Sequence, residues 1–314
     1  MGAVTGCASS HSGAPPPPSA GSASAPVTAS AGQIVAQIQV GAYPDGITAG
    51  FGSLWTANLT ADSVSRINPA TRRVTATIRV AGGPLRMLAT DGAMWIADYN
   101  GAMLTRIDPS TDRVSGTVRV GSQPQSLAVA DGALWVFSAG DKTASVIDMS
   151  TLRVLRTVRI GIASGFVAVQ DGLLWAPDFQ GRSRTVLALA PGTGKAVHTV
   201  AVGSQPEQVG FGFGSGWVGN GSDDTVTRFD PATGAVVHTI PITGDGAGLL
   251  VSDGGVWVAG YVAGSLSKIS PASNSVVGTI SLPLGSEPND IVAADGYLWV
   301  TESEINEVAV IRPS

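Results

Sequence analysis

Hydrophobic and polar positions along the chain alternate in short runs that are typical of β-strands. One 40-residue stretch contains four such runs, rich in Val, Ile and Leu: Ser126–Ala130, Ala133–Phe137, Ala144–Asp148 and Val154–Ile160. Asp131-Gly132 separates the first two runs, and its glycine tolerates the positive φ angle of a tight hairpin turn. No stretch shows a sustained helical period, so the pattern predicts an all-β protein.

A repeat of 40 to 42 residues organises these strands. A glycine lies three residues before each of the seven tryptophans, which are Trp55, Trp95, Trp135, Trp175, Trp217, Trp257 and Trp299. Four antiparallel strands repeated with this period are typical of a propeller blade. The sequence therefore predicts a seven-bladed β-propeller in which each tryptophan packs between neighbouring blades.

The two ends of the chain predict how the ring closes. The seventh unit stops at Ser314 without a fourth strand, whereas an unmatched strand, Ile34–Gly41, precedes the first unit. We expect this N-terminal strand to complete the last blade, because closing the ring removes open strand edges. The predicted organisation is a Ser/Ala/Pro-rich tether over residues 1–33 and one propeller domain over residues 34–314.

Composition excludes several other classes of protein. The chain has 18 Lys and Arg against 23 Asp and Glu, with 13% charged and 44% hydrophobic residues. So few charges and so many apolar residues exclude a disordered chain and a coiled coil. The acidic balance argues against nucleic-acid binding, because phosphate contacts need clustered Lys and Arg. No apolar run approaches the ~20 residues of a membrane-spanning helix.

Two motifs resemble those of known propellers. Residues 146–161 resemble the YVTN-type repeat, whose units end in a VID-xxT-xxV-xxTI-xVG pattern. Residues 288–302 look like the streptogramin (virginiamycin B) lyase repeat, which carries P-x-x-I, D-G and L-W-F-T-E. The similarity spans residues 34–314. For the lyase family it implies Mg²⁺ with His and Glu at the tunnel mouth, opening a lactone ring by elimination. Glu302 falls at the family's Glu position.

Propellers usually bind ligands at one mouth of the central tunnel, near the start of each inner strand and the end of each second strand. The candidate ligand-binding residues are Tyr43, Asp45, Asn58, Arg86, Asp98, Asp178, Asn220, Asp245, Glu287, Asn289, Asp290 and Glu302. Equivalent inner-strand positions in the other blades are Leu85, Gln125, Gly165, Glu207 and Ala247.

This ring is polar and mostly acidic, with Arg86 as its main cation. Acidic side chains gather over blades six, seven and one, and repel one another unless a cation lies between them. We therefore expect this sector to attract a cationic ligand group or a divalent cation, Mg²⁺ or Ca²⁺, with Asp290 and Glu302 as candidate metal ligands.

Two functions of different classes remain open. The first is a binding or scaffold protein for a peptide, a glycan or another protein, and the second is a Mg²⁺-dependent lyase. His11 lies in the tail, and His198 and His238 lie in outer strands, so no histidine is available as a base at the mouth. The residues therefore favour binding over lyase chemistry. A closed ring leaves no open blade edge, so a monomer is expected.

The N-terminal segment suggests where the protein acts. Val4-Thr5-Gly6-Cys7 resembles a bacterial lipobox, and Cys7 is the only cysteine. Only six residues precede it, so either the native chain starts further upstream or Cys7 is an ordinary tail cysteine. The first alternative predicts lipidation at Cys7 and a place in the bacterial cell envelope, outside the cytoplasm. On this view the protein touches the membrane only through its lipid. Secretion without an anchor is the other possibility.

Overall fold

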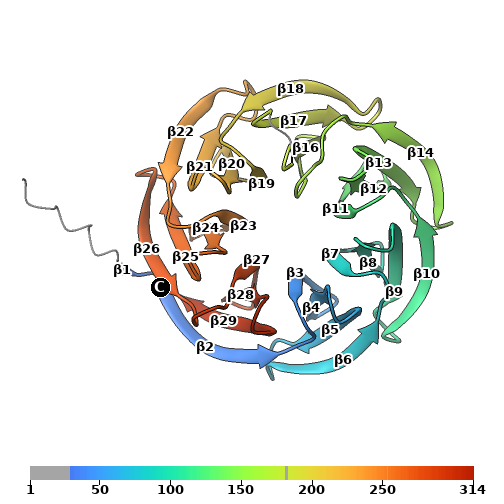
Figure 1. The fold of residues 1–314 in the computed structure, drawn as a ribbon, viewed down its shortest axis with the longest axis horizontal. Helices are drawn as coiled ribbons and strands as arrows, with labels where there is room; N and C mark the ends of the chain where they lie inside the picture. Colours follow the sequence, from blue (N-terminus) through green and yellow to red (C-terminus); the bar gives the residue numbers. More distant parts are fainter. Residues whose placement is uncertain (1–28, 181–182, 253) are drawn as a thin grey trace, which may run out of the picture.

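The structure, a computed structural model, describes residues 29–180, 183–252 and 254–314. Within these ranges all regular structure is β, in seven antiparallel sheets arranged as a ring around a central axis (Figure 1). In the same ranges no helix is long and apolar enough to cross a membrane. The seven-bladed β-propeller predicted from the repeat is confirmed.

Each blade has an inner, a second, a third and an outer strand. The inner strands are β3 (Pro44–Gly50), β7 (Pro84–Thr90), β11 (Pro124–Ala130), β15 (Ala168–Gln170), β19 (Pro206–Gly212), β23 (Gly246–Ser252) and β27 (Pro288–Ala294). The second strands are β4 (Ser53–Asn58), β8 (Ala93–Asp98), β12 (Ala133–Ser138), β16 (Leu173–Pro177), β20 (Ser215–Asn220), β24 (Gly255–Gly260) and β28 (Tyr297–Glu302).

The third strands are β5 (Ser63–Asn68), β9 (Met103–Asp108), β13 (Thr143–Asp148), β17 (Thr185–Ala190), β21 (Thr225–Phe229), β25 (Ser265–Ser270) and β29 (Glu307–Pro313). The outer strands are β6 (Arg73–Arg79), β10 (Arg113–Arg119), β14 (Arg153–Arg159), β18 (Lys195–Ala201), β22 (Val236–Pro241), β26 (Ser275–Ser281) and β2 (Gly32–Gln39). A short strand, β1 (Ala29–Ser30), is added to blade six.

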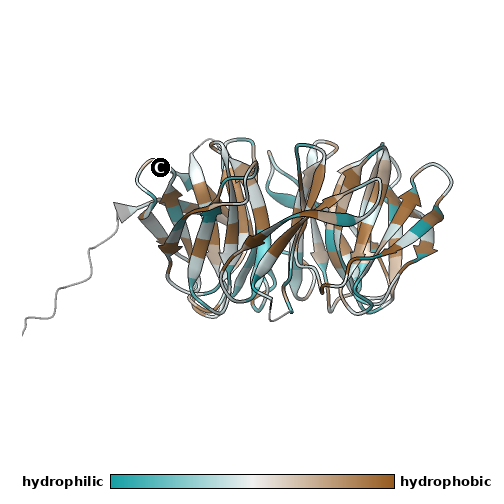
Figure 2. Ribbon diagram, turned by 90° about the horizontal axis from the view of Figure 1, so that it is seen from above, coloured by the Kyte–Doolittle hydropathy of each residue, from teal (hydrophilic) through white to brown (hydrophobic). Residues whose placement is uncertain are grey.

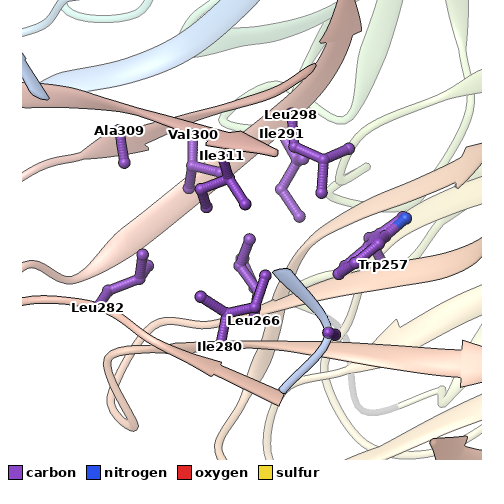
Figure 3. Close-up of a cluster of buried hydrophobic side chains, with 11 residues drawn as sticks. Trp257, Leu266, Ile280, Leu282, Ile291, Leu298, Val300, Ala309 and Ile311 are labelled. Atoms are coloured by element: carbon purple, nitrogen blue, oxygen red, sulfur yellow. The ribbon is translucent and has the colours of Figure 1, made fainter. Parts of the chain in front are cut away.

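The tryptophans fill the layers between blades, as predicted. All seven are at most 1% exposed. Trp55 packs with Val64 of its own blade and with Met94 of blade two. Burying ~200 Å² of indole surface contributes on the order of 5 kcal/mol. The layer between blades six and seven shows the same construction, with Trp257 and Leu266 on one side and Leu298 on the other (Figure 3). Seen edge-on, hydrophobic residues alternate with polar ones along the strands (Figure 2).

A basic side chain on the third strand ties most blades to the next one. Arg66 lies over the Trp55 ring at 4.8 Å and donates to the Pro109 carbonyl oxygen of blade two at 2.8 Å. Equivalent third-strand cations lie over the tryptophans of blades two, five and six: Arg106, Arg228 and Lys268. In blade three Val146 stands opposite Trp135, and the cation over the ring is Arg156 of the outer strand β14. Blades four and seven carry Ala188 and Val310 opposite their tryptophans. Their junctions with the next blade therefore rest on other contacts.

The N-terminal strand closes the ring, as expected. β2 pairs antiparallel with β29 from Gly32 to Gln39 and takes the place of the missing fourth strand. It begins two residues before the predicted Ile34. Further upstream, β1 pairs in parallel with Gly278 and Thr279 of β26, and the buried Ala31 packs between blades six and seven. The closing segment therefore overlaps two blades.

The two ends of the inner strands differ. At one end tight turns lead to the second strands, and Asp131 and Gly132 have φ angles of 49° and 73°, as a hairpin of this kind requires. At the other end the register shifts as the strand begins, for example between Pro124 and Ser126. All inner strands except β15 begin with such an irregularity, and bulges of this kind redirect side chains.

Candidate ligand-binding site

A pocket of about 360 Å³ opens where the inner strands begin. Every blade contributes to its wall the residue that follows the proline of the inner strand, or the equivalent residue: Asp45, Leu85, Gln125, Gly165, Glu207, Ala247 and Asn289. Tyr43 and Asp245, on the other side of that proline position, also line the pocket. The structure thus places four of the candidate residues, Tyr43, Asp45, Asp245 and Asn289, directly in its wall.

A rim of large apolar and aromatic side chains surrounds these residues. Leu59, Tyr99, Phe179 and Tyr261 all lie four residues after a tryptophan and line the pocket. Sequence reasoning missed them because it took the position three residues after each tryptophan. The available signal was the presence of aromatic residues where the second strand turns away from the tunnel.

The candidates three residues after a tryptophan do not line the pocket. They are at most 4% exposed: Asn58, Asp98, Asp178, Asn220 and Glu302. The Asn58 amide donates to the hydroxyls of Ser63 and Ser65 in the third strand. Successive residues of a strand point to opposite sides, so a shift of one residue moves a side chain from the pocket to the blade interior. These polar side chains bind the ends of their own blades together.

Arg86 from β7 is buried beside the pocket, in contact with residues of three other blades. Its Nη1 lies 2.5 Å from Asp45 Oδ1 of blade one and 3.5 Å from Asp290 Oδ2 of blade seven. The guanidinium also lies 3.6 Å from the centroid of the Phe166 ring, which precedes β15 of blade four. Asn289 completes the cluster by donating to Asp45 Oδ2 at 3.0 Å. One buried cation therefore joins blades one, two, four and seven.

The wall of blades five and six is built differently. Glu207 is half-buried, and its hydrogen bond comes from the Gln205 side chain at 3.4 Å. Burial, followed by repulsion from Asp245, raises the pKa of Glu207 from 4.5 to about 8. Asp245 accepts a 2.8 Å hydrogen bond from the Val262 backbone, and burial raises its pKa as well. Glu207 forms no ion pair with any Lys or Arg of the described ranges, so this wall presents a carboxyl group without a salt bridge.

Tyr43 and Tyr261 close the side of the pocket over blades one and six. Their hydroxyl oxygens lie 3.0 Å apart. Burial, with hydrogen bonds to Glu287 and Tyr43, raises the pKa of Tyr261. The candidate residue Glu287 therefore stands behind the pocket wall, where it accepts from Tyr261.

The arrangement does not fit the divalent cation that the lyase resemblance implies. Among the described residues, no group of three or more His, Cys, Asp or Glu side chains is placed to hold a metal ion. Asp290 accepts from the Ile47 backbone and lies beside Arg86, whereas Glu302 accepts from Gln37 of the outer strand β2. The two candidate metal ligands thus have different partners and do not form a common site.

The histidines of the described ranges lie far out in the blades. His198 is in the outer strand β18, where it stacks on Trp175, and His238 is in the outer strand β22. Neither lines the pocket. Cys7 and His11 lie outside the described residues.

The ring, its closure and its tunnel-mouth pocket define the chain as a seven-bladed β-propeller with a ligand-sized pocket. No family model and no curated protein matches the sequence. Among solved structures, the fold is similar to virginiamycin B lyase from Staphylococcus aureus, with a TM-score of 0.78 and 13% identity over 89% of this chain and 99% of that one. A catalytically inactive variant of the same enzyme, with a histidine replaced by alanine, was solved with quinupristin and matches equally well, with a TM-score of 0.78 and 14% identity over 89% of this chain and 99% of that one.

Hydrazine synthase from Kuenenia stuttgartiensis is also similar, with a TM-score of 0.74 and 14% identity over 86% of this chain and 96% of that one. Enzymes with such different names share this architecture at the same low identity. These similarities therefore describe the fold.

Proposed function

We propose that this protein is a binding module that takes its ligand in the pocket at the tunnel mouth. The observation that carries the proposal is the pocket wall, to which all seven blades contribute a side chain. A concave, largely apolar site with a few convergent polar groups is typical of ligand binding. Its volume of about 360 Å³ suits a small molecule or one protruding group of a peptide, glycan or protein.

Binding is tested by probing peptide and glycan arrays with the labelled protein and with an Ala247→Phe variant. Ala247 lines the pocket, so a phenylalanine there occupies ligand space. We expect array signals that the variant loses while its melting temperature stays close to that of the parent. Signals that persist in a folded Ala247→Phe variant, or none with the parent protein, contradict the proposal.

Lyase activity is the second candidate, and the fold similarity to virginiamycin B lyase favours it. Against it stand the positions of His198 and His238 in outer strands and the lack of a metal-ligand group among the described residues. Incubation with quinupristin and Mg²⁺, followed by mass spectrometry, separates the two candidates. A ring-opened product that Ala247→Phe fails to form would establish the lyase and displace the binding module.

The proposed location is the bacterial cell envelope, outside the cytoplasm, with a lipid on Cys7 as the anchor. The lipobox-like Val4–Cys7 and the Ser/Ala/Pro-rich segment after it support this proposal. Changing Cys7→Ser in the native gene is expected to move the protein from the membrane fraction to the soluble fraction. An unchanged distribution means that the motif is a coincidence.

A further inference from the structure

In the pocket wall of blades five and six, the carboxyl oxygens of Glu207 accept only a long hydrogen bond within the described part of the chain. Glu207 follows Pro206 at the start of β19, and a Cβ added at Gly221 would lie 2.9 Å from Glu207 Oε1. The carboxyl group therefore lies over the end of β20, at the edge of the pocket. Its hydrogen bond from Gln205 measures 3.4 Å, which is at the weak limit.

The cation beside the pocket has no such free capacity. No Lys or Arg of the described ranges lines the pocket, and Arg86, which contacts the lining residues Asp45 and Phe166, has a side chain that is 9% exposed. Asp45 and Asp290 already neutralise it, and Phe166 covers one face of the guanidinium. Arg86 is thus engaged within the protein, and an anionic ligand would find no free cation there.

Aromatic side chains provide the remaining walls. Tyr99 from blade two, Phe179 from blade four and Tyr261 from blade six all line the same pocket. Aromatic faces attract ammonium and guanidinium groups and also accept flat apolar bodies. The pocket therefore combines aromatic side chains with a carboxyl group that forms no ion pair in the described part of the chain.

From this combination we infer that the ligand is an organic cation. An ammonium or guanidinium group binds the Glu207 carboxylate, and the flat or apolar body to which it is attached lies among Tyr99, Phe179 and Tyr261. This inference rests on the proposed function, because it assigns a chemical class to the ligand of the same pocket. A lysine or arginine side chain of a partner and a free arylalkylamine share this chemistry.

Binding of such a cation is coupled to loss of a proton. The groups facing Glu207 are Asp245, Asp45 and Arg86, and their combined effect with burial is a pKa of about 8. Most molecules therefore carry a protonated Glu207 at pH 7. An ammonium ion favours the ionised carboxylate, so binding releases a proton to the buffer.

The experiment is isothermal titration calorimetry with benzylammonium and with benzyl alcohol, its neutral counterpart. Titration at pH 7 in two buffers of different ionisation enthalpy reports the proton release. We expect benzylammonium to bind about tenfold or more tightly than benzyl alcohol, and Glu207→Gln to remove both this preference and the proton release. Glu304→Gln is the matched control, because Glu304 is exposed in the turn between β28 and β29.

Three results would overturn the inference: no binding of benzylammonium at millimolar concentration, equal binding of the neutral alcohol, or an unchanged affinity in folded Glu207→Gln. A failure of this kind is distinct from failure of the proposed function. An array ligand that is lost in Ala247→Phe but retained in Glu207→Gln would keep the pocket as the binding site and reject the cationic class.

Discussion

The charged side chains on the two sides of the mouth pocket differ in their partners. On the side of blades seven, one and two, Asp45 and Asp290 share one buried guanidinium and are held by further hydrogen bonds. On the side of blades four, five and six, Glu207 has one long hydrogen bond from a neutral side chain. The charges of the first wall are paired within the protein, whereas the Glu207 carboxyl group of the second wall can accept further hydrogen bonds. For the proposed ligand, this difference favours the side of blades four, five and six.

Removing the cation from the first wall is expected to have the largest effect. Arg86→Met leaves Asp45 and Asp290 buried without their positive partner, which costs about 3–5 kcal/mol of unfolding free energy. Urea denaturation at pH 7 measures the loss. Adding Asp45→Asn and Asp290→Asn to the same variant should recover much of it. A loss below ~1 kcal/mol for Arg86→Met alone would show that the cluster does not stabilise the ring.

A methyl group at Gly165 disturbs the other wall. A Cβ at this position would overlap the backbone carbonyl oxygen of Glu207, which accepts from the Phe166 backbone. This contact helps to join blades four and five. Blade four has Ala188 opposite its tryptophan, in place of the basic side chain that contacts the next blade elsewhere. We expect Gly165→Ala to cost about 1–3 kcal/mol by chemical denaturation. Gly192→Ala serves as control, since a Cβ there meets nothing within 4 Å, and equal losses in both would contradict the packing argument.

The pH dependence of stability should report Glu207 directly. Its pKa is raised from 4.5 to about 8 on folding, so the folded state favours the protonated acid. The contribution of Glu207 to the free energy of unfolding is then fully present below pH 4.5 and is lost as the pH rises towards 8. Burial acts with the same sign on Asp98 and Glu302, whose pKa values are raised to about 7.

Glu207→Gln is expected to reduce the fall in stability between pH 5 and pH 8.5 by about 1–2 kcal/mol. The measurement is urea denaturation of the parent and the variant at both pH values. Asp98→Asn should reduce the fall separately, whereas Glu304→Gln should leave it unchanged. Parallel curves for the parent and Glu207→Gln would mean that Glu207 is ionised at neutral pH in the folded protein.

The smallest expected effect is at the tyrosine pair. Tyr43→Phe removes the 3.0 Å contact between the Tyr43 and Tyr261 hydroxyls, at a cost of about 0.5–1.5 kcal/mol. Thermal denaturation of this variant beside Tyr99→Phe, on the same rim, isolates the contribution of the hydrogen bond. If Tyr99→Phe lowers the melting temperature as much, the pair has no special role in closing the pocket.

The architecture and part of the pocket could be predicted from the sequence because they depend on the repeat. The tryptophan period defined the blades, and the proline at the start of the inner strands identified wall residues such as Asp45 and Asn289. The rim could not be placed to the residue. Side chains alternate between the two faces of a strand, so an error of one residue selects the wrong face. Asp98 was therefore expected at the pocket, where Tyr99 lies.

The partners of Arg86 could not be predicted from the sequence either. Asp45 is 41 residues away and Asp290 is 204 residues away, and only the closed ring brings them to the same side chain. The pKa of Glu207 depends on the same three-dimensional assembly, since burial and Asp245 cause it. A sequence repeat identifies positions that recur in every blade. The contacts among residues that differ from blade to blade become visible only in the folded structure.

The pairing of β2 has a mechanical consequence. Gly32, where β2 begins, pairs with Pro313 at the end of the blade away from the pocket, and Gln39 pairs with Glu307 near the mouth. A pull on the chain at Ala29 acts first on the pairs of β1 with β26 and then on the seven residue pairs of β2 with β29. These pairs must break before the closing strand can leave the ring. The strand that closes the ring therefore also carries any force applied to the N-terminal side of the propeller.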